Sequence, residues 1–283
     1  MSIRIRIFAD FCDSISAKKI IDKISYYNGD KIHITSGDDY THVIIWNTVM
    51  PNIREGIPKE NVIGFAQEPL VYLRLTEQFI QYAQIHIHKY YIGDVLELPP
   101  PFVENNGYLL YNMRLKELKP KNNIMSIMIS QKLHQPGHKY RHALANAILK
   151  TNLPIDIYGR GCGFDLYDQN DSRLKGKFDR YEPYDGYLFH ICIENVISNH
   201  YFSEKIINPL LTKTTPIYLG CKNIYNYFPN CVIYLTGNVE TDMLLLTDIM
   251  KNPFNYNKKF DIDDIDEIEK LVSLKYNVAE LFE

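Results

Sequence analysis

The sequence of 283 residues predicts an α/β protein built from two Rossmann-like domains. Two observations lead to this fold class. In both halves of the chain, short apolar or alternating segments typical of strands recur between segments with helical spacing, a rhythm typical of parallel sheets. A polar, charged segment with one proline, residues 112–123, separates the halves. We therefore predict one domain over residues 1–118 and a second over residues 119–283, whose C-terminal helices can cross back onto the first.

The first half begins with an alternating strand over residues 3–9. A further strand over residues 61–66 ends at Gln67-Glu68-Pro69, where the proline ends the hydrogen-bonded ladder. Glu68 is therefore expected at the carboxyl end of a strand, the edge at which parallel sheets bind ligands. The other predicted elements are helices over residues 15–26 and 70–84, strands over 41–47 and 85–89, and an extended proline run over 98–102.

The second half is organised around residues 184–220. The apolar run 188–193 predicts a buried strand that ends at Glu194-Asn195, Ser203 is a suitable N-cap for a helix, and residues 216–220 predict the next parallel strand. Glu204 and Lys205 would lie in the first helical turn, where free backbone N–H groups and the helix dipole favour an anion. The other predicted elements are strands over 124–130 and 232–237, a strand running into a glycine-rich loop over 153–163, and helices over 138–150, 221–229, 238–251 and 264–275.

A plainer interpretation exists for the same polar residues. Glu204 and Lys205 can form an ordinary solvated ion pair, and Glu194-Asn195 an ordinary turn.

Composition excludes several classes of function. A net charge of −3, from 31 basic and 34 acidic residues, gives no electrostatic footprint for nucleic acid. The five cysteines form no C-x-x-C pair, which predicts free thiols in a reducing compartment. The chain shows no signal peptide and no run of 18 apolar residues, so we predict a cytoplasmic protein without a membrane anchor; its oligomeric state stays open.

Three other motifs suggest sites at first sight, but each has a plainer interpretation. His134, His138 and His142 suggest a metal, but two histidines four residues apart without a third ligand are more often surface residues. The D-x-D string at residues 261–263 is better explained as a charged helix start. The loop at residues 159–163 lacks the third glycine of a dinucleotide fingerprint, which argues against a dehydrogenase.

The spacing of the polar residues in the second half resembles the signature of the α-1,3/4-fucosyltransferase family. The similarity consists of Glu194-Asn195, five residues, Tyr201, two residues, Glu204-Lys205, and then a strand from Pro216 to Gly220. A strand ending in Ser130 before a helix that carries Arg141 in its opening part is also similar to the family, as are, more weakly, residues 64–69 around Glu68.

The resemblance implies the GT-B arrangement, in which two Rossmann-like domains face each other across a cleft. It implies an inverting glycosyltransferase that moves fucose from GDP-fucose to a hydroxyl of a glycan acceptor. Glu68 would be the general base, with His86 and His88 as rivals; Arg141 and Lys205 would contact the diphosphate. The family also implies a donor site that includes Glu194, Asn195, Tyr201 and Glu204.

Because Arg141, Lys205 and the N–H groups of the helix start can meet the charge of the donor phosphates, we expect that no metal cofactor is required, while stimulation by a divalent cation stays open. Two departures bear on the donor sugar: Val196 replaces the usual Ser or Thr, and Pro209 lies inside the predicted helix, which it should kink. The alternatives are a transferase for another sugar nucleotide and a non-catalytic carbohydrate- or nucleotide-binding protein on the same fold.

Overall fold

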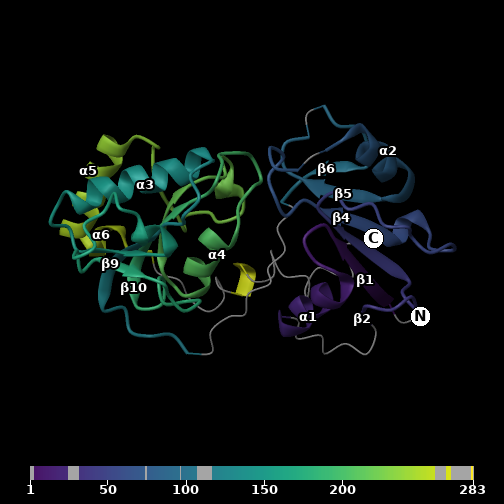
Figure 1. The fold of residues 1–283 in the computed structure, drawn as a ribbon, viewed down its shortest axis with the longest axis horizontal. Helices are drawn as coiled ribbons and strands as arrows, with labels where there is room; N and C mark the ends of the chain where they lie inside the picture. The colour runs from purple at the N-terminus through teal and green to yellow at the C-terminus, as the bar shows by residue number, and fades with distance from the viewer. Residues whose placement is uncertain are drawn as a thin grey trace. The chain divides into compact units, whose positions relative to one another are not determined.

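The computed structural model describes residues 3–24, 32–73, 75–95, 97–106, 117–258, 266–268 and 282, in two compact units (Figure 1). Unit 1 contains the described residues up to 106, the segment Ser198–Tyr201 and Phe282. Unit 2 contains the described residues 117–197, 202–258 and 266–268. The chain thus leaves unit 2 after Ile197 and returns to it at Phe202.

Unit 1 is built on a six-stranded sheet in the order β2-β1-β3-β4-β5-β6, in which every neighbouring pair is parallel. All carboxyl ends of its strands therefore lie at one edge. The strands are β1 (Ile3–Ala9), β2 (Ile32–Thr35), β3 (His42–Trp46), β4 (Val62–Phe65), β5 (Lys89–Ile92) and β6 (Phe102–Glu104). The helices are α1 (Ser14–Ile24), the short 3-10 helix η1 (Lys59–Asn61) and α2 (Glu77–His86).

Both faces of this sheet are buried. Alternate residues of β3 show it: Ile44 and Trp46 pack with Ala17 and Ile21 of α1, whereas Val43 and Ile45 belong to the core that contains α2. A parallel sheet needs such cover on both faces because its crossover helices lie on them. The nearly continuous apolar runs of β3 and β4 follow from that double burial.

Unit 2 has the strand order of a dinucleotide-binding fold. Its six parallel strands follow the order β9-β8-β7-β10-β11-β12, which is 3-2-1-4-5-6 in the unit's own numbering. They are β7 (Asn123–Met128), β8 (Ile155–Tyr158), β9 (Leu174–Gly176), β10 (Tyr187–Ile193), β11 (Thr215–Leu219) and β12 (Ile233–Tyr234). The helices are α3 (Pro136–Leu149), η2 (Arg160–Gly163), α4 (Glu204–Leu211), η3 (Ile224–Asn226), α5 (Val239–Lys251) and α6 (Pro253–Tyr256).

The helices of unit 2 pack through their apolar faces. Leu144 and Ile148 of α3, together with Leu246 and Ile249 of α5, join the core formed by the strands. Helix α4 contacts β10 and β11, and its apolar residues from Ile206 onward are buried. This packing fixes the first turn of α4 beside the end of β10.

The predicted α/β class is confirmed, and most predicted elements exist within a few residues of their bounds. The strand expected over residues 85–89 is wrong: α2 runs to His86, and β5 begins only at Lys89. Thr76 caps α2, its side chain accepting the N–H of Phe79 at 3.1 Å, and the buried pair Phe79 and Ala83 has helical spacing.

Other expectations need smaller corrections. The helix expected from residue 70 starts at Glu77, and the proline run ends in β6. The edge strands β2 and β9 and the short helix α6 were not predicted. Most of the helix expected over residues 264–275, and the whole D-x-D string, lie outside the described residues. None of the helices that the structure describes is long and apolar enough to cross a membrane.

Candidate active site

A constellation of charged and polar residues lies where the strand order of unit 2 reverses. That reversal falls between β7 and β10, and ligands of open α/β sheets bind at this point, beyond the carboxyl ends of the strands. Glu194 and Asn195 follow β10 directly, and the chain that leaves β7 enters α3. The sequence therefore places its polar residues at the expected edge.

Glu194 is 1% exposed, and its carboxylate is held by the helix that follows. It accepts the backbone N–H of Ser203 at 2.9 Å and the Ser203 hydroxyl at 2.8 Å. Lys205 Nζ lies 3.4 Å from the same carboxylate. Gly220 keeps space for it, because a Cβ at that position would lie 2.5 Å from Glu194 Cγ. Glu194 thus ties the end of β10 to the start of α4.

Asn195 makes the corresponding link to α3. Its side-chain oxygen accepts a hydrogen bond from Arg141 Nη2, and its backbone oxygen accepts the N–H of Gly137 at 3.0 Å. Arg141 Nε in turn donates to the Gly137 oxygen at 3.2 Å. A side chain at position 137 is not tolerated, because its Cβ would lie 1.8 Å from the oxygen of Glu194. These contacts orient the Arg141 guanidinium toward the end of β10.

Lys205 is the second cation at this site. Its ammonium donates to the Ser203 hydroxyl at 2.9 Å and to Glu204 Oε1 at 3.2 Å. Burial alone would lower its pKa, but the charges of Glu194 and Glu204 outweigh that effect and raise it. Burial would likewise raise the pKa of Glu204, yet the pairing with Lys205 lowers it. Both groups therefore carry their charges at neutral pH.

The charges of Arg141 and Lys205 influence each other and the neighbouring His138. The positive charge of Arg141 opposes the raised pKa of Lys205, and both cations contribute to the lowered pKa of His138. Burial is the main cause of that shift, which brings the pKa of His138 to about 4. His138 is therefore neutral at pH 7. Two cations beside a helix start suit a bound polyanion such as a diphosphate.

The histidines of α3 are occupied by protein contacts. Both ring nitrogens of His142 have partners, the Tyr167 hydroxyl at 2.6 Å and the Ser130 oxygen at 2.7 Å. The ring of His134 packs edge-on against that of His138. Among the residues that the structure describes, no group of three His, Cys, Asp or Glu side chains is arranged to hold a metal ion.

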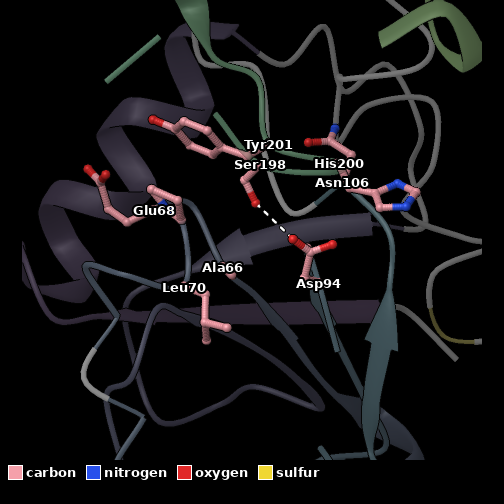
Figure 2. A pocket seen from close by; sticks show the side chains of 10 residues that line it. Ala66, Glu68, Leu70, Asp94, Asn106, Ser198, His200 and Tyr201 are labelled. Carbon is pink, nitrogen blue, oxygen red and sulfur yellow. Dashed lines mark hydrogen bonds between the residues drawn. The ribbon is translucent and has the colours of Figure 1, made fainter. Parts of the chain in front are cut away.

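Glu68 and Tyr201 belong to unit 1, where they line a small hollow that opens to solvent (Figure 2). Glu68 follows β4 and is exposed, whereas Tyr201 is 8% exposed. His86 ends α2, and His88 lies just before β5, so His88 is at the opposite edge of the sheet from Glu68. Their location disfavours both histidines as rivals of Glu68.

The structure thus divides the predicted site residues into two groups. Unit 2 brings together Arg141, Glu194, Asn195, Glu204 and Lys205, and unit 1 brings together Glu68 and Tyr201.

One supporting residue was missed by the sequence analysis. Asn47 has a positive φ of 55°, and its side-chain oxygen accepts the backbone N–H of Gln67 at 3.0 Å, next to Glu68. An asparagine directly after a strand is the available sequence signal, since Asn is among the few residues that tolerate this backbone region.

The family model for glycosyltransferase family 10 (fucosyltransferase), C-terminal part, matches residues 118–275, more than half of the chain. A protein of Acanthamoeba polyphaga mimivirus, whose name provisionally assigns it to the fucosyltransferases, is 29% identical over 184 residues, 58% of this chain and 28% of that protein. A fucosyltransferase-like protein of Arabidopsis thaliana is 30% identical over 126 residues, 43% of this chain and 23% of that protein. The chain thus spans about a quarter of the length of these curated relatives.

Solved structures share the fold. A crystal structure of an α1,3-fucosyltransferase with GDP-fucose has a TM-score of 0.55 at 14% identity, covering 100% of this chain and 90% of that one. The structure of TarM has a TM-score of 0.55 at 12% identity, covering 88% of this chain and 56% of that one. This likeness confirms the GT-B fold class that the sequence predicts, and the matched family model extends over unit 2 with its Arg141, Asn195 and Lys205. The chain therefore belongs to glycosyltransferase family 10, the fucosyltransferases.

Proposed function

We propose that this protein transfers fucose from GDP-fucose to a hydroxyl group of a glycan acceptor, with inversion at the anomeric carbon. One observation supports the proposal most strongly. Asn195 holds Arg141 and Glu194 holds Lys205 at the point where the strand order of unit 2 reverses. The family supports it, as does the fold shared with an α1,3-fucosyltransferase solved with GDP-fucose.

The donor site uses charges that the chain itself supplies. Arg141 and Lys205 neutralise the diphosphate, and the first turn of α4 adds backbone N–H groups and the positive end of its dipole. Because these groups are held by Asn195, Glu194 and Ser203, they need little reorganisation when negative charge develops on the leaving GDP. By analogy with the family, Asn195 and Glu204 would contact the nucleotide ribose and the sugar. Glu194 acts by holding Ser203 and Lys205.

The reaction also needs a base on the acceptor. In our proposal the Glu68 carboxylate takes the proton of the acceptor hydroxyl while its oxygen attacks the anomeric carbon and the bond from that carbon to GDP breaks. A general base of this kind contributes about 10² to 10⁴ in rate. Since Arg141 and Lys205 meet the diphosphate charge, the proposal requires no metal, and added divalent cations should stimulate at most modestly.

The test is the variant Glu68→Gln, which keeps the shape of the side chain and removes the base. We expect fucose transfer to fall at least about 100-fold while the Kd for GDP is unchanged. His88→Gln serves as the matched control and should transfer normally, because His88 precedes β5 at the other edge of the sheet. Undiminished transfer by Glu68→Gln would rule out the base. GDP-fucose binding without any transfer by the wild-type protein would favour the non-catalytic alternative.

A further inference from the structure

An exposed aromatic ring lies over a buried one at the carboxyl edge of the sheet in unit 1. Phe11 comes two residues after the end of β1 and is 56% exposed, whereas Trp46, the last residue of β3, is 1% exposed. The two rings stack, with their centroids 5.7 Å apart and their planes at 18°. Trp46 thus covers one face of Phe11, and the exposed area belongs to the opposite face and the rim of the ring.

The fold holds this ring in a fixed place. Strands β1 and β3 are neighbours, and Ala9 pairs directly with Trp46 in their register, so Phe11 lies just beyond the paired strand ends. Trp46 itself belongs to the core that contains Ala17 and Ile21 of α1. A ligand that stacks on Phe11 therefore meets a surface that loses little conformational freedom on binding.

The surroundings of Phe11 are polar. Asp10 and Asp13 are exposed carboxylates on either side of it in the chain. Asp10 accepts Asn47 Nδ2 at 2.9 Å, and Asp13 accepts the backbone N–H of Ser16 at 2.7 Å. A purely apolar partner that covered Phe11 would also desolvate these carboxylates, which is costly. A ligand that combines an apolar face with hydroxyl groups avoids this cost, because carboxylate oxygens accept hydrogen bonds from hydroxyls.

A sugar ring combines these two properties. Its C–H groups form an apolar face that can lie flat on an aromatic ring, and its hydroxyl groups project from the rim of the sugar. The geometry of Phe11, one aromatic face between two carboxylates, therefore suits a sugar better than an apolar segment of another protein.

Phe11 also lies at the edge of the sheet that carries Glu68. Ala9, Trp46 and Phe65 form one row across β1, β3 and β4, so these three strands end at the same level. Neighbouring strands are about 4.8 Å apart, which separates the ends of β1 and β4 by about 10 Å. Two linked sugar rings span such a distance, so a sugar at Glu68 can place its neighbour on Phe11.

Asn47 connects the two places through hydrogen bonds. Its side chain donates to Asp10 next to Phe11 and accepts the backbone N–H of Gln67 next to Glu68. The loops that follow β1, β3 and β4 are therefore held to one another at this edge, and the spacing between the aromatic ring and the proposed base is fixed.

We infer that Phe11 is a stacking platform for the acceptor, on which it binds the sugar ring adjacent to the one whose hydroxyl receives fucose. The inference rests on the proposed transfer reaction, since it extends the acceptor site of that reaction from Glu68 toward β1. It requires an acceptor of at least two sugar units, of which the second contacts Phe11. A monosaccharide can reach Glu68 but does not gain this contact.

The experiment measures KM and kcat for two acceptors, N-acetyllactosamine and N-acetylglucosamine, which differ by one galactose ring, with GDP-fucose as donor. In Phe11→Leu an apolar side chain still covers Trp46, but the flat face is lost. We expect the KM for the disaccharide to rise at least about fivefold, because a stacking contact is lost. The KM for the monosaccharide, the kcat and the Kd for GDP should not change.

Two further variants provide the controls. Phe11→Tyr keeps the flat ring and should retain the wild-type KM for the disaccharide. Phe254→Leu makes the same change at an exposed phenylalanine of α6 in unit 2 and should alter the KM for neither acceptor. If Phe11 served only as a cover for Trp46, its loss would lower Tm and affect both acceptors alike.

The outcomes separate the two claims. An unchanged KM for the disaccharide in Phe11→Leu, an equal rise for both acceptors, or the same rise in Phe11→Tyr would overturn the inference on Phe11. Hydrolysis of GDP-fucose with neither sugar used would overturn it as well and leave donor chemistry intact. If the wild type uses the disaccharide alone, the comparison of Phe11→Leu with Phe11→Tyr decides. Failure to bind or turn over GDP-fucose with any acceptor would contradict the proposed function itself.

Discussion

The Glu194 carboxylate accepts two hydrogen bonds from Ser203: the backbone N–H donates to Oε1 at 2.9 Å, and the hydroxyl donates to Oε2 at 2.8 Å. Ser203 is also the N-cap of α4, and its oxygen accepts from Lys205 Nζ at 2.9 Å. One serine therefore joins the end of β10, the helix start and the cation that we assign to the donor phosphates.

Ser203→Ala should accordingly reduce both stability and donor binding. Loss of an N-cap costs about 1 kcal/mol, and Glu194, which is 1% exposed, loses a hydrogen-bond donor as well. We expect Tm to fall by about 4 °C or more and the Kd for GDP to rise several-fold. Ser203→Thr retains the hydroxyl and should recover most of both properties; equal losses in the two variants would contradict this role of the hydroxyl.

Gly137→Ala tests the contact between the start of α3 and the end of β10. The added Cβ would lie 1.8 Å from the Glu194 oxygen, so the backbone must shift and move Arg141 with it. We expect a lower Tm and at least tenfold weaker GDP binding, on the order of 1.4 kcal/mol. Gly163→Ala, where nothing lies within 4 Å of the new Cβ, should change neither. Similar behaviour of the two variants would argue against the close approach.

Asn47 is predicted to position Glu68 through the loop after β4. Its side chain accepts the Gln67 N–H at 3.0 Å and donates to Asp10 at 2.9 Å. Asn47→Gly tolerates the positive φ but removes both bonds, whereas Asn47→Ala also places a Cβ in a disfavoured backbone region, at a cost of about 1 kcal/mol.

Both Asn47 variants should therefore lower kcat about tenfold without changing the Kd for GDP, and Asn47→Ala should have the lower Tm. A normal kcat in Asn47→Gly would show that the Gln67 contact does not position the base.

Stability should fall in acid because His138 is kept neutral by the fold. Its pKa is lowered from 6.5 to about 4, chiefly by burial and then by Arg141. The unfolded chain therefore binds a proton between pH 6.5 and 4 that the folded chain excludes, and stability rises with pH across that window. This one residue accounts for at most about 3 kcal/mol at pH 4.

His138→Gln should reduce this pH dependence. Glutamine is accepted at the third position of a capping box, so α3 should keep its start. We expect a shallower fall of Tm between pH 6.5 and 4 than in the wild type. His190, fully buried beside Ser126 with its pKa lowered to about 3 by burial, retains its share of the acid sensitivity. An unchanged slope would contradict the assignment to His138.

Much of the fold could be predicted because its signals are local. The strands β1, β7 and β10 have long apolar or alternating runs, and Ser203, a typical N-cap residue, indicates where α4 starts. The edge strands β2 and β9, of four and three residues, are too short for periodicity to reveal. The start of α2 depends on the cap at Thr76, which the apolar pattern alone does not locate.

The candidate site could be predicted only in part. Glu194, Asn195, Glu204 and Lys205 lie close together in sequence, and the end of a strand and the start of a helix carry them to one edge. The hydrogen bond from Arg141 to Asn195 joins residues that are 54 positions apart. Glycine is needed at position 137 because the backbone after β10 approaches it closely in the folded chain. Such contacts depend on packing and leave no periodic trace in the sequence.

The most direct test of the central claim is a calorimetric titration of GDP, UDP, ADP and NAD into the wild type, Lys205→Ala and Lys251→Ala. Lys251 is exposed at the end of α5 and controls for the loss of one charge. We predict selective GDP binding by the wild type, unchanged in Lys251→Ala and at least about tenfold weaker in Lys205→Ala, since a charge-assisted contact to phosphate is lost. Equal GDP affinity in all three proteins, or no preference for GDP, would contradict the account.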